Sequence, residues 1–540
     1  MIHTHLSRGS KEADTSCIVR PFQFFSPRGC NSRVTSVKFH PTKICSSLKG
    51  GNRDGYFWYE ARRDARHLRP GLSPLICKKK TMGRFNVGIK TKTENLAGGR
   101  AFKMGTKEEL LHAVLTTFLT NKFYETGDDR LSRIQALIAG VPADFVAKLA
   151  VVSRKEFHLR SVFHALVGEL SKIHRGDDLV RKVIEKGVER PDDLTEIAGY
   201  LEGKLSKQVK RGMRRAILKF SPYSIAKYRM EGKKIKLVDI FNLVHPKPQF
   251  ASEEQKVAWK ALMEGKLIST DTWESRLSSG EDKRKVWRDM VLEKKIGYMA
   301  LLRNLRNIES QADEETKKAA ASMISDRGQV KKSKQLPFRF YKAYSNVSEL
   351  LFTNAIAQAM EYSVDNVPDI DGLTLIGVDT SGSMSGDPIE KASIIASALI
   401  KKSNCDVMLY DTKIQSVNFN SIDSVIGNSW KIQKLAQGGG TKTSLVFYYA
   451  HQTGKKYKRI IILSDNESWD EYSVQSVYNE YRKENDCYVY AIDIEGYGTT
   501  DVKGKMVEHI GGFSERIFDF ILAKEKGTQT LLDYVEKYEI

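Results

Sequence analysis

Three short polar segments in the last third of the 540-residue chain combine residue types that bind a hard cation. They span residues 379–383 (DTSGS), 438–441 (GGGT) and 464–467 (SDNE). Two carboxylates and several hydroxyls form a set of oxygen ligands that suits Mg²⁺, with one position open for an acidic ligand. We expect the serine hydroxyls to coordinate directly, the carboxylates to bind directly or through waters, and the threonine to add an oxygen. The predicted metal ligands are Asp379, Ser381, Ser383, Thr441 and Asp465.

The elements around these segments predict that they meet at one edge of a sheet. Apolar runs at 373–378, 407–410, 459–463, 488–492 and 516–520 predict strands, and 388–402, 443–453 and 527–537 predict helices. Strands that alternate with helices and are buried on both faces predict an open parallel sheet. In such sheets the ligand site lies beyond the carboxyl ends of the strands. The alternative is that the serines and aspartates only cap the next helix and the glycines only turn the chain.

The sequence gives no support for a catalytic centre. We find no nucleophile with a base beside it and no phosphate-binding GxxxxGK[ST] loop. We therefore expect a protein that is not an enzyme.

From about residue 104 to residue 361 the pattern is one helix after another. A capping box at Thr106–Glu109 predicts the first helix start. Apolar stripes at helical spacing follow near 131–139, 143–152, 158–173, 178–187, 193–203, 206–219, 255–264, 284–307 and 346–361. Helix pairs stacked as a solenoid explain this pattern, although no strict sequence period marks the repeats.

Basic residues are concentrated between Lys204 and Lys236, where Glu231 is the single acid. The run has few aromatic residues, which favours phosphate contacts to a structured RNA over base stacking on a single strand. The alternative is a solvated helix face. His245, before two prolines, is either a helix-end residue or an RNA contact. The candidate RNA-binding residues are Lys207, Lys210, Arg211, Arg214, Arg215, Lys227, Arg229, Lys233, Lys234, Lys236, His245 and Lys247.

Charge and composition divide the chain into three parts. The net charge is +21 and 41% of residues are hydrophobic, so a polyanion partner is expected and whole-chain disorder is excluded. No apolar run is long enough to span a membrane. Residues 1–81 (net +11) are expected to be an upstream extension before a natural start at Met82, or else a disordered basic RNA-binding arm. The few cysteines, without CxxC or CxxH pairs, argue against zinc and fit a cytoplasmic compartment.

The polar segments at 379–383, 441 and 465 resemble the metal-ion-dependent adhesion site of von Willebrand factor A domains. The middle of the chain resembles the TROVE module of the Ro ribonucleoprotein family. The stretches that carry this second resemblance are 212–219, 237–248, 299–306 and 336–341. Together the resemblances cover residue 85 to the end, with a TROVE domain at 82–370 and an A domain at 371–540.

The resemblance implies a ring or horseshoe of irregular HEAT-like repeats closed by the Rossmann-like A domain. It also implies a monomeric, cytoplasmic, membrane-free scaffold for RNA quality control. Such proteins bind small structured non-coding RNA (Y RNA) on an outer basic surface and single-stranded 3′ ends of misfolded RNA in the ring, and some partner a 3′ exoribonuclease. Carried onto this chain, the Y RNA surface falls on Lys227, Lys233, Lys234 and His245.

One residue departs from the family pattern, and two other functions stay open. Lys442 follows Thr441 where many A domains have an acid, which should reduce negative charge near the metal. The alternatives are a protein-binding A-domain adaptor with a helical spacer and a metal-dependent nuclease.

Overall fold

Helices follow one another along the chain from Thr106 to Ser363. The structure is a computed structural model that describes residues 92–116, 127–267, 270–470, 473–512, 516–527 and 530–540. The chain divides into Met1–Gly83 and Arg84–Ile540, and every described residue belongs to the second unit. The extension predicted at 1–81 lies outside the described residues.

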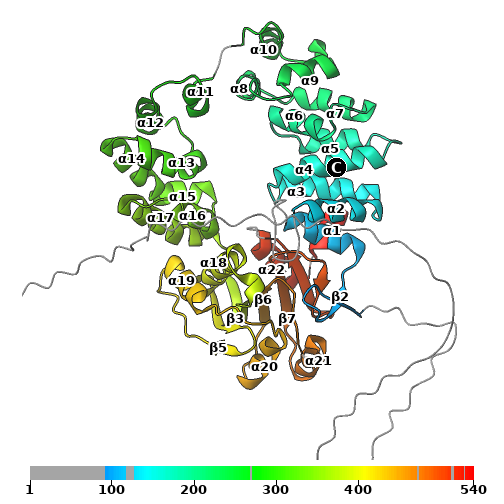
Figure 1. Cartoon of the computed structure of the whole chain (residues 1–540), viewed down its shortest axis with the longest axis vertical. Coiled ribbons are helices and arrows are strands. Elements are labelled where there is room, and N and C mark those ends of the chain that lie inside the picture. Colours follow the sequence, from blue (N-terminus) through cyan, green and yellow to red (C-terminus); the bar gives the residue numbers. More distant parts are fainter. Residues whose placement is uncertain (1–91, 117–126, 268–269, 471–472, 513–515, 528–529) are drawn as a thin grey trace, which may run out of the picture. The chain divides into compact units, whose positions relative to one another are not determined.

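The helices of this region are short, and most are separated by turns of a few residues. They are α1 (Thr106–Leu115), α2 (Gly127–Ala139), α3 (Ala143–Lys155), α4 (Arg160–Ile173), α5 (Leu179–Gly187), α6 (Pro191–Tyr200), α7 (Lys207–Ile217), α8 (Pro222–Lys227), α9 (Leu237–Val244), α10 (Glu253–Met263), α11 (Trp273–Ser278), α12 (Lys283–Leu292), α13 (Tyr298–Gln311), α14 (Glu314–Ile324), α15 (Arg327–Ser333), α16 (Pro337–Tyr344) and α17 (Leu350–Ser363). Each packs on near neighbours in the chain, α3 on α4 and α5, α5 on α7, and α16 on α17. The helices follow an arc (Figure 1), as the predicted irregular repeats require.

Two details of the predicted helices are wrong. The stripe at 284–307 is two helices, because Lys294 takes a left-handed φ of 53° and Gly297 caps the start of α13. The first helix is capped by Gly105, whose backbone N–H donates to the Glu108 carboxylate at 3.4 Å, one residue earlier than the predicted box.

The last third of Arg84–Ile540 is an α/β domain around a six-stranded sheet of order β5-β4-β3-β6-β7-β9. All neighbouring strands are parallel except β5, which is antiparallel to β4. The strands are β3 (Ile370–Asp379), β4 (Ser403–Tyr410), β5 (Ile414–Ser416), β6 (Arg459–Ser464), β7 (Tyr488–Asp493) and β9 (Val507–Gly511). The helices are α18 (Asp387–Lys402), α19 (Val425–Leu435), α20 (Ser444–Gln452), α21 (Val474–Glu484), α22 (Arg516–Glu525) and α23 (Leu531–Lys537).

Helices cover both faces of this sheet. Residues of α18 and α22 pack with one set of strand residues, and residues of α20 and α21 pack with the other set. The predicted strand at 516–520 is wrong, because Ile517, Phe518 and Ile521 are buried at the i, i+1, i+4 spacing of a helix. The fifth parallel strand is β9 instead.

A second, small sheet joins the start of the described chain to the α/β domain. It consists of β1 (Lys92–Glu94), β2 (Arg100–Lys103) and β8 (Thr499–Thr500) in antiparallel order. Strands of two to four residues leave no periodic pattern in a sequence, and this sheet was not predicted.

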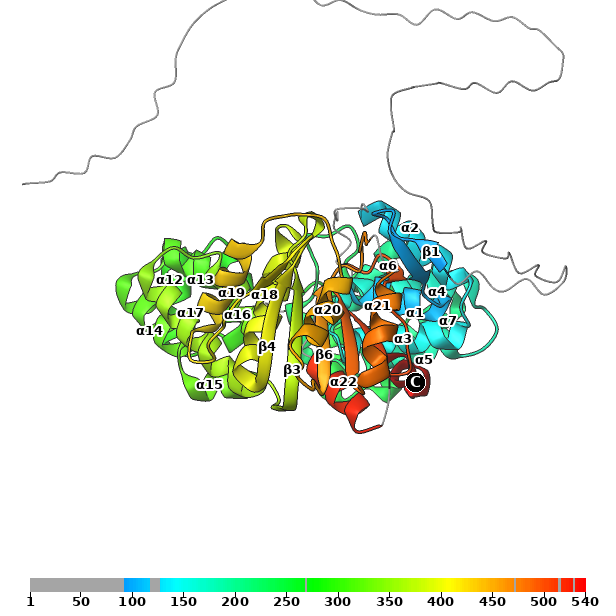
Figure 2. The ribbon, with the colours of Figure 1, turned by 90° about the horizontal axis from the view of Figure 1, so that it is seen from below.

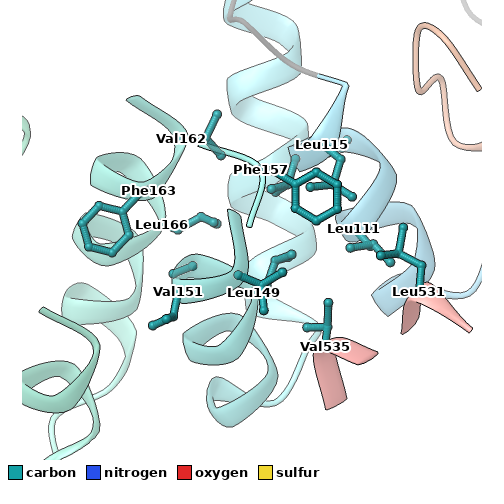
Figure 3. Packing of buried hydrophobic residues seen from close by; sticks show 14 of the residues in the cluster. Leu111, Leu115, Leu149, Val151, Phe157, Val162, Phe163, Leu166, Leu531 and Val535 are labelled. Atoms are coloured by element: carbon teal, nitrogen blue, oxygen red, sulfur yellow. The ribbon is translucent and has the colours of Figure 1, made fainter. Parts of the chain in front are cut away.

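Both ends of the helical series pack against the α/β domain. At one end α1 contacts β9 and α23, and α23 contacts α3. Figure 3 shows Leu111 of α1, Leu149 of α3 and Val535 of α23 in this shared core. At the other end α16 contacts α18 and α17 contacts α19, as the view from below also shows (Figure 2). Among the described helices, none is long and apolar enough to cross a bilayer.

Candidate metal centre and basic surface

Asp379 ends β3 and is fully buried. Its Oδ2 accepts a hydrogen bond from Ser464 Oγ at 2.7 Å, and its Oδ1 accepts the backbone N–H of Ser381 at 2.9 Å. Because β3 and β6 are parallel neighbours, Asp379 and Ser464 fall at the same edge of the sheet. The structure therefore brings the first and third polar segments together, as the sequence predicts.

The two predicted serine ligands face each other beside the glycine loop. Ser381 Oγ and Ser383 Oγ lie 3.3 Å apart, and both residues are buried. The backbone N–H of Gly382 donates to the Gly439 carbonyl at 2.9 Å. A Cβ on Gly439 would lie 3.1 Å from the carboxyl carbon of Asp411, so a side chain there would crowd the site. Glycine at position 439 thus lets the second polar segment pack closely against Asp411.

Burial and mutual repulsion disfavour the charged form of the carboxylates in this site. Burial raises the pKa of Asp379, and the nearby Asp411 adds to the rise. Burial and the charge of Asp379 raise the pKa of Asp465 well above its ordinary range. Asp465 Oδ2 is buried and accepts no hydrogen bond from the described residues. Two close buried carboxylates, an unused carboxylate oxygen and two facing hydroxyls fit a divalent cation, whose charge would offset the repulsion.

Thr441 is buried, and its backbone anchors the segment after Asp465. Its carbonyl accepts the Trp469 backbone N–H at 2.8 Å and lies 3.3 Å from Ser468 Oγ. The next residue, Lys442, is half-buried. Burial raises the pKa of Asp470 nearby, and the charge of Lys442 opposes that rise.

Asp411 was not predicted, although it directly follows the strand that ends at Tyr410. It is buried at the same sheet edge, and that position was the available signal. Within the described ranges no group of three or more His, Cys, Asp or Glu side chains is placed to hold a metal.

The candidate RNA-binding residues lie on α7, α8, the loop between α8 and α9, and the turn after α9. Lys207, Arg211 and Arg215 are exposed one helical turn apart along one side of α7. Lys233, Lys234 and Lys236 are exposed in the α8–α9 loop and form no ion pair with acids of the described residues. We call these three residues the basic loop.

Other candidates are partly engaged within the protein. Arg211 and Arg215 approach acids of the α5 region, Asp178 at 3.2 Å and Glu185 at 3.6 Å, although both arginines stay 56% exposed. Arg214 Nε donates to the Val244 carbonyl at 2.8 Å and so ties α7 to α9.

Two further candidates sit beside acids, and the last three form no ion pair with acids of the described residues. Lys227 lies 3.5 Å from Glu274, and Arg229 lies 3.1 Å from Glu231. His245 ends α9 with a left-handed φ of 46° and is exposed. The remaining two, half-buried Lys210 and exposed Lys247, have no ion pair with described acids.

A second group of exposed cations was not singled out by the sequence. It consists of Arg303 and Arg306 on α13, and Arg339 and Lys342 on α16, two helices in contact. We call this group the α13–α16 cations. None of the four pairs with an acid of the described chain. Each pair is spaced by three residues on an amphipathic helix, which in a sequence is the ordinary mark of a solvated face.

A comparison with known protein families finds a match to one segment of the chain. Residues 263–363, from the end of α10 to the end of α17, match the model of the TROVE domain. The matched segment includes the α13–α16 cations and begins after the basic loop.

Two individual proteins are also similar to this chain. Telomerase protein component 1 of Mus musculus is 31% identical over 86 residues, 16% of this chain, and the match spans about 3% of that relative's length. The crystal structure of the RO (RSR) protein of Deinococcus radiodurans superposes with a TM-score of 0.56 at 13% identity, over 79% of this chain and 100% of that one. At this identity the likeness shows the fold, and it confirms the predicted class of helical repeats with an α/β domain.

Proposed function

We propose that this protein belongs to the TROVE family and is a non-enzymatic RNA-binding scaffold of a Ro-type ribonucleoprotein that takes small structured, Y-like RNA on α7 and the basic loop. The observation that carries the proposal is the basic loop itself, three neighbouring exposed lysines that form no ion pair with acids of the described residues. Their charge is available to phosphates, whereas that of Lys227 and Arg229 is partly offset by nearby glutamates. A surface of this kind recognises RNA by backbone position more than by base identity.

The α13–α16 cations support a second contact, with single-stranded 3′ ends of misfolded RNA. Figure 1 draws α13 on the inner side of the helical arc relative to α14, and α16 contacts α13. Arg side chains bind phosphates in a planar, bidentate manner, which suits an extended backbone.

The test is filter binding of a small hairpin RNA across a salt series. A triple charge reversal, Lys233→Glu, Lys234→Glu and Lys236→Glu, should weaken binding at least about tenfold and flatten the salt slope by about three, one for each lost phosphate contact. The matched control is Lys483→Glu, Lys505→Glu and Lys526→Glu, which changes the net charge equally on the α/β domain. If both triple variants lose the same affinity, only net charge matters and the site assignment fails.

We assign no catalytic step to the protein. Incubation of pure protein with RNA and Mg²⁺ should leave the RNA intact, and Mg²⁺-dependent cleavage that Asp379→Asn abolishes would favour the nuclease alternative. The adaptor alternative predicts that wild-type protein binds the hairpin RNA no better than the triple variant.

For the metal centre we propose Mg²⁺ held by the hydroxyls of Ser381, Ser383 and Thr441, with Asp379 and Asp465 beside it. The ion would supply a positive centre able to bind an acidic group of a partner. A 3′ exoribonuclease is the partner we propose for RNA quality control, with the protein monomeric in a cytoplasmic ribonucleoprotein. Crosslinking in the native cell, followed by sequencing of bound RNA and identification of bound protein, tests this part.

A further inference from the structure

The tip of the β1–β2 hairpin lies on the segment that follows the candidate metal ligand Asp465. Asn95 is 6% exposed, and its Nδ2 donates to the Ser468 carbonyl at 2.7 Å. The backbone N–H of Ala97 donates to Glu467 Oε2 at 3.1 Å. Gly99 packs so closely that an added Cβ would lie 1.8 Å from the Ser468 oxygen. The hairpin therefore packs on Glu467 and Ser468 and holds them by hydrogen bonds, although they lie about 370 residues later in the sequence.

Glu467 and Ser468 in turn contact candidate metal ligands. The Glu467 backbone N–H donates to Asp465 Oδ1 at 3.2 Å. Ser468 Oγ lies 3.3 Å from the Thr441 carbonyl and accepts the Thr443 backbone N–H at 3.1 Å. One short segment thus links two candidate ligands, and the hairpin fixes that segment from outside.

The α/β domain holds Glu467 from the opposite direction. Thr499 Oγ1, in β8, donates to Glu467 Oε1 at 3.2 Å, and β8 pairs with β2. The Glu467 carboxylate is 1% exposed and is shared between the hairpin and the strand that the hairpin pairs with. Release of the hairpin would therefore leave a buried carboxylate short of donors and free its backbone to shift.

We propose that the β1–β2 hairpin is part of the metal centre, and that Asn95 is a positioning residue that sets Thr441 and Asp465 through Ser468 and Glu467. The inference rests on the proposed Mg²⁺ site and adds that residues outside the α/β domain determine its affinity. By linkage, bound metal must stabilise the docked hairpin by the same factor by which the docked hairpin strengthens metal binding.

The experiment measures Mg²⁺ and Mn²⁺ binding to the full chain by titration calorimetry. Asn95→Ala should weaken binding about tenfold, as loss of an outer-shell partner does at other metal sites. Leu96→Ala is the matched control, because the Leu96 side chain is 54% exposed and the hairpin backbone stays unchanged. Gly99→Ala, which cannot dock without a backbone shift, should weaken binding at least as much.

The readouts separate this inference from the metal site itself. Asn95→Ala or Gly99→Ala with wild-type affinity, while hydrogen exchange shows the tip released, overturns the role of the hairpin only. Wild-type protein that binds neither metal overturns the metal site and the hairpin role with it. If both variants fail to fold, hydrogen exchange of the wild-type protein decides: added metal must protect the amides of Ala97 and Gly99, and unchanged protection overturns the proposal.

Discussion

Asp193 in the helical region and Asp379 in the α/β domain are both completely buried, yet their surroundings treat the negative charge in opposite ways. Asp193 meets His164 Nε2 at 3.0 Å, Arg160 Nε at 2.5 Å and Arg154 at 3.2 Å. Burial alone would raise the pKa of Asp193, but the hydrogen bonds of His164 and Arg160 and the charge of Arg154 hold it well below its ordinary value.

Asp379 has hydroxyl and backbone donors but no ion pair with a described cation, and its pKa is raised by burial and by Asp411. Asp465 beside it leaves an oxygen unused. The presence or absence of neighbouring cations therefore suggests how to tell a structural carboxylate from one that binds a ligand. A protein that provides its own cations completes a structural network, whereas one that leaves buried carboxylates uncompensated leaves that charge to a ligand.

The largest effect should come from removing the charge of the compensated carboxylate. Asp193→Asn removes the carboxylate that Arg154 and Arg160 bond inside the helical region. We therefore expect the free energy of unfolding to fall by about 3 kcal/mol. Urea unfolding followed by circular dichroism measures it. Asp177→Asn removes an exposed carboxylate that pairs with His174 at 2.8 Å, and it should lower the free energy of unfolding far less than Asp193→Asn does. Equal losses in the two variants would break the comparison.

The uncompensated carboxylate should behave differently. Asp379→Asn keeps the shape of the side chain and removes a repulsive charge, so unfolding in a chelator should be unchanged or slightly harder. Wild-type protein should gain about 2.7 kcal/mol at a Mg²⁺ concentration of about 100 times the dissociation constant, and the variant should gain nothing.

The control for this prediction is Asp369→Asn, an exposed residue paired with Lys402 at 2.9 Å, which should keep the full Mg²⁺ effect. Thermal unfolding with and without Mg²⁺ measures all three proteins. A large loss of stability for Asp379→Asn in chelator would mean that Asp379 is a structural carboxylate like Asp193.

The pH dependence of stability should show the same contrast on a smaller scale. Because the folded pKa of Asp193 lies below its unfolded value of 3.8, its contribution is present above that value and is lost as pH falls. From pH 4 downward the wild-type protein should lose up to about 1.4 kcal/mol per pH unit from this group. Asp193→Asn should flatten that limb, as urea midpoints measured at several pH values would show.

The sequence predicts well which polar segments meet at the sheet edge, because their signal is local. The DTSGS and SDNE segments directly follow apolar runs, and parallel strands bring such ends to one edge whatever the rest of the chain does. The same reasoning fails for groups whose meaning depends on distant partners. Asp193 reads as an ordinary acid in a first helical turn, since its partners lie 29–39 residues earlier in the chain.

The β1–β2 hairpin and the basic surface show the same limit. The hairpin contributes seven residues of strand and pairs with a two-residue strand near residue 500. Strands this short show no recognisable alternation of apolar and polar residues in the sequence. The run from Lys204 to Lys236 is visible in the sequence, but its division into engaged residues and the basic loop depends on Glu274, Asp178 and Glu185 from other helices. The density of basic residues can be read from the local sequence, whereas the acids that pair with them are brought close only by the tertiary structure.

The smallest predicted effect tests whether a positive charge near the proposed Mg²⁺ site lowers its affinity for the ion. Lys442 adjoins Thr441 and its charge acts on Asp470, so it places positive potential near the proposed Mg²⁺ site. Lys442→Gln should therefore raise Mg²⁺ affinity about threefold, since one half-buried charge at this range acts through a high effective dielectric. Lys483→Gln, on an exposed part of α21, should leave the affinity unchanged. If Lys442→Gln weakens binding instead, Lys442 holds the loop of Thr441 in place, and the ordering of that loop outweighs the charge repulsion.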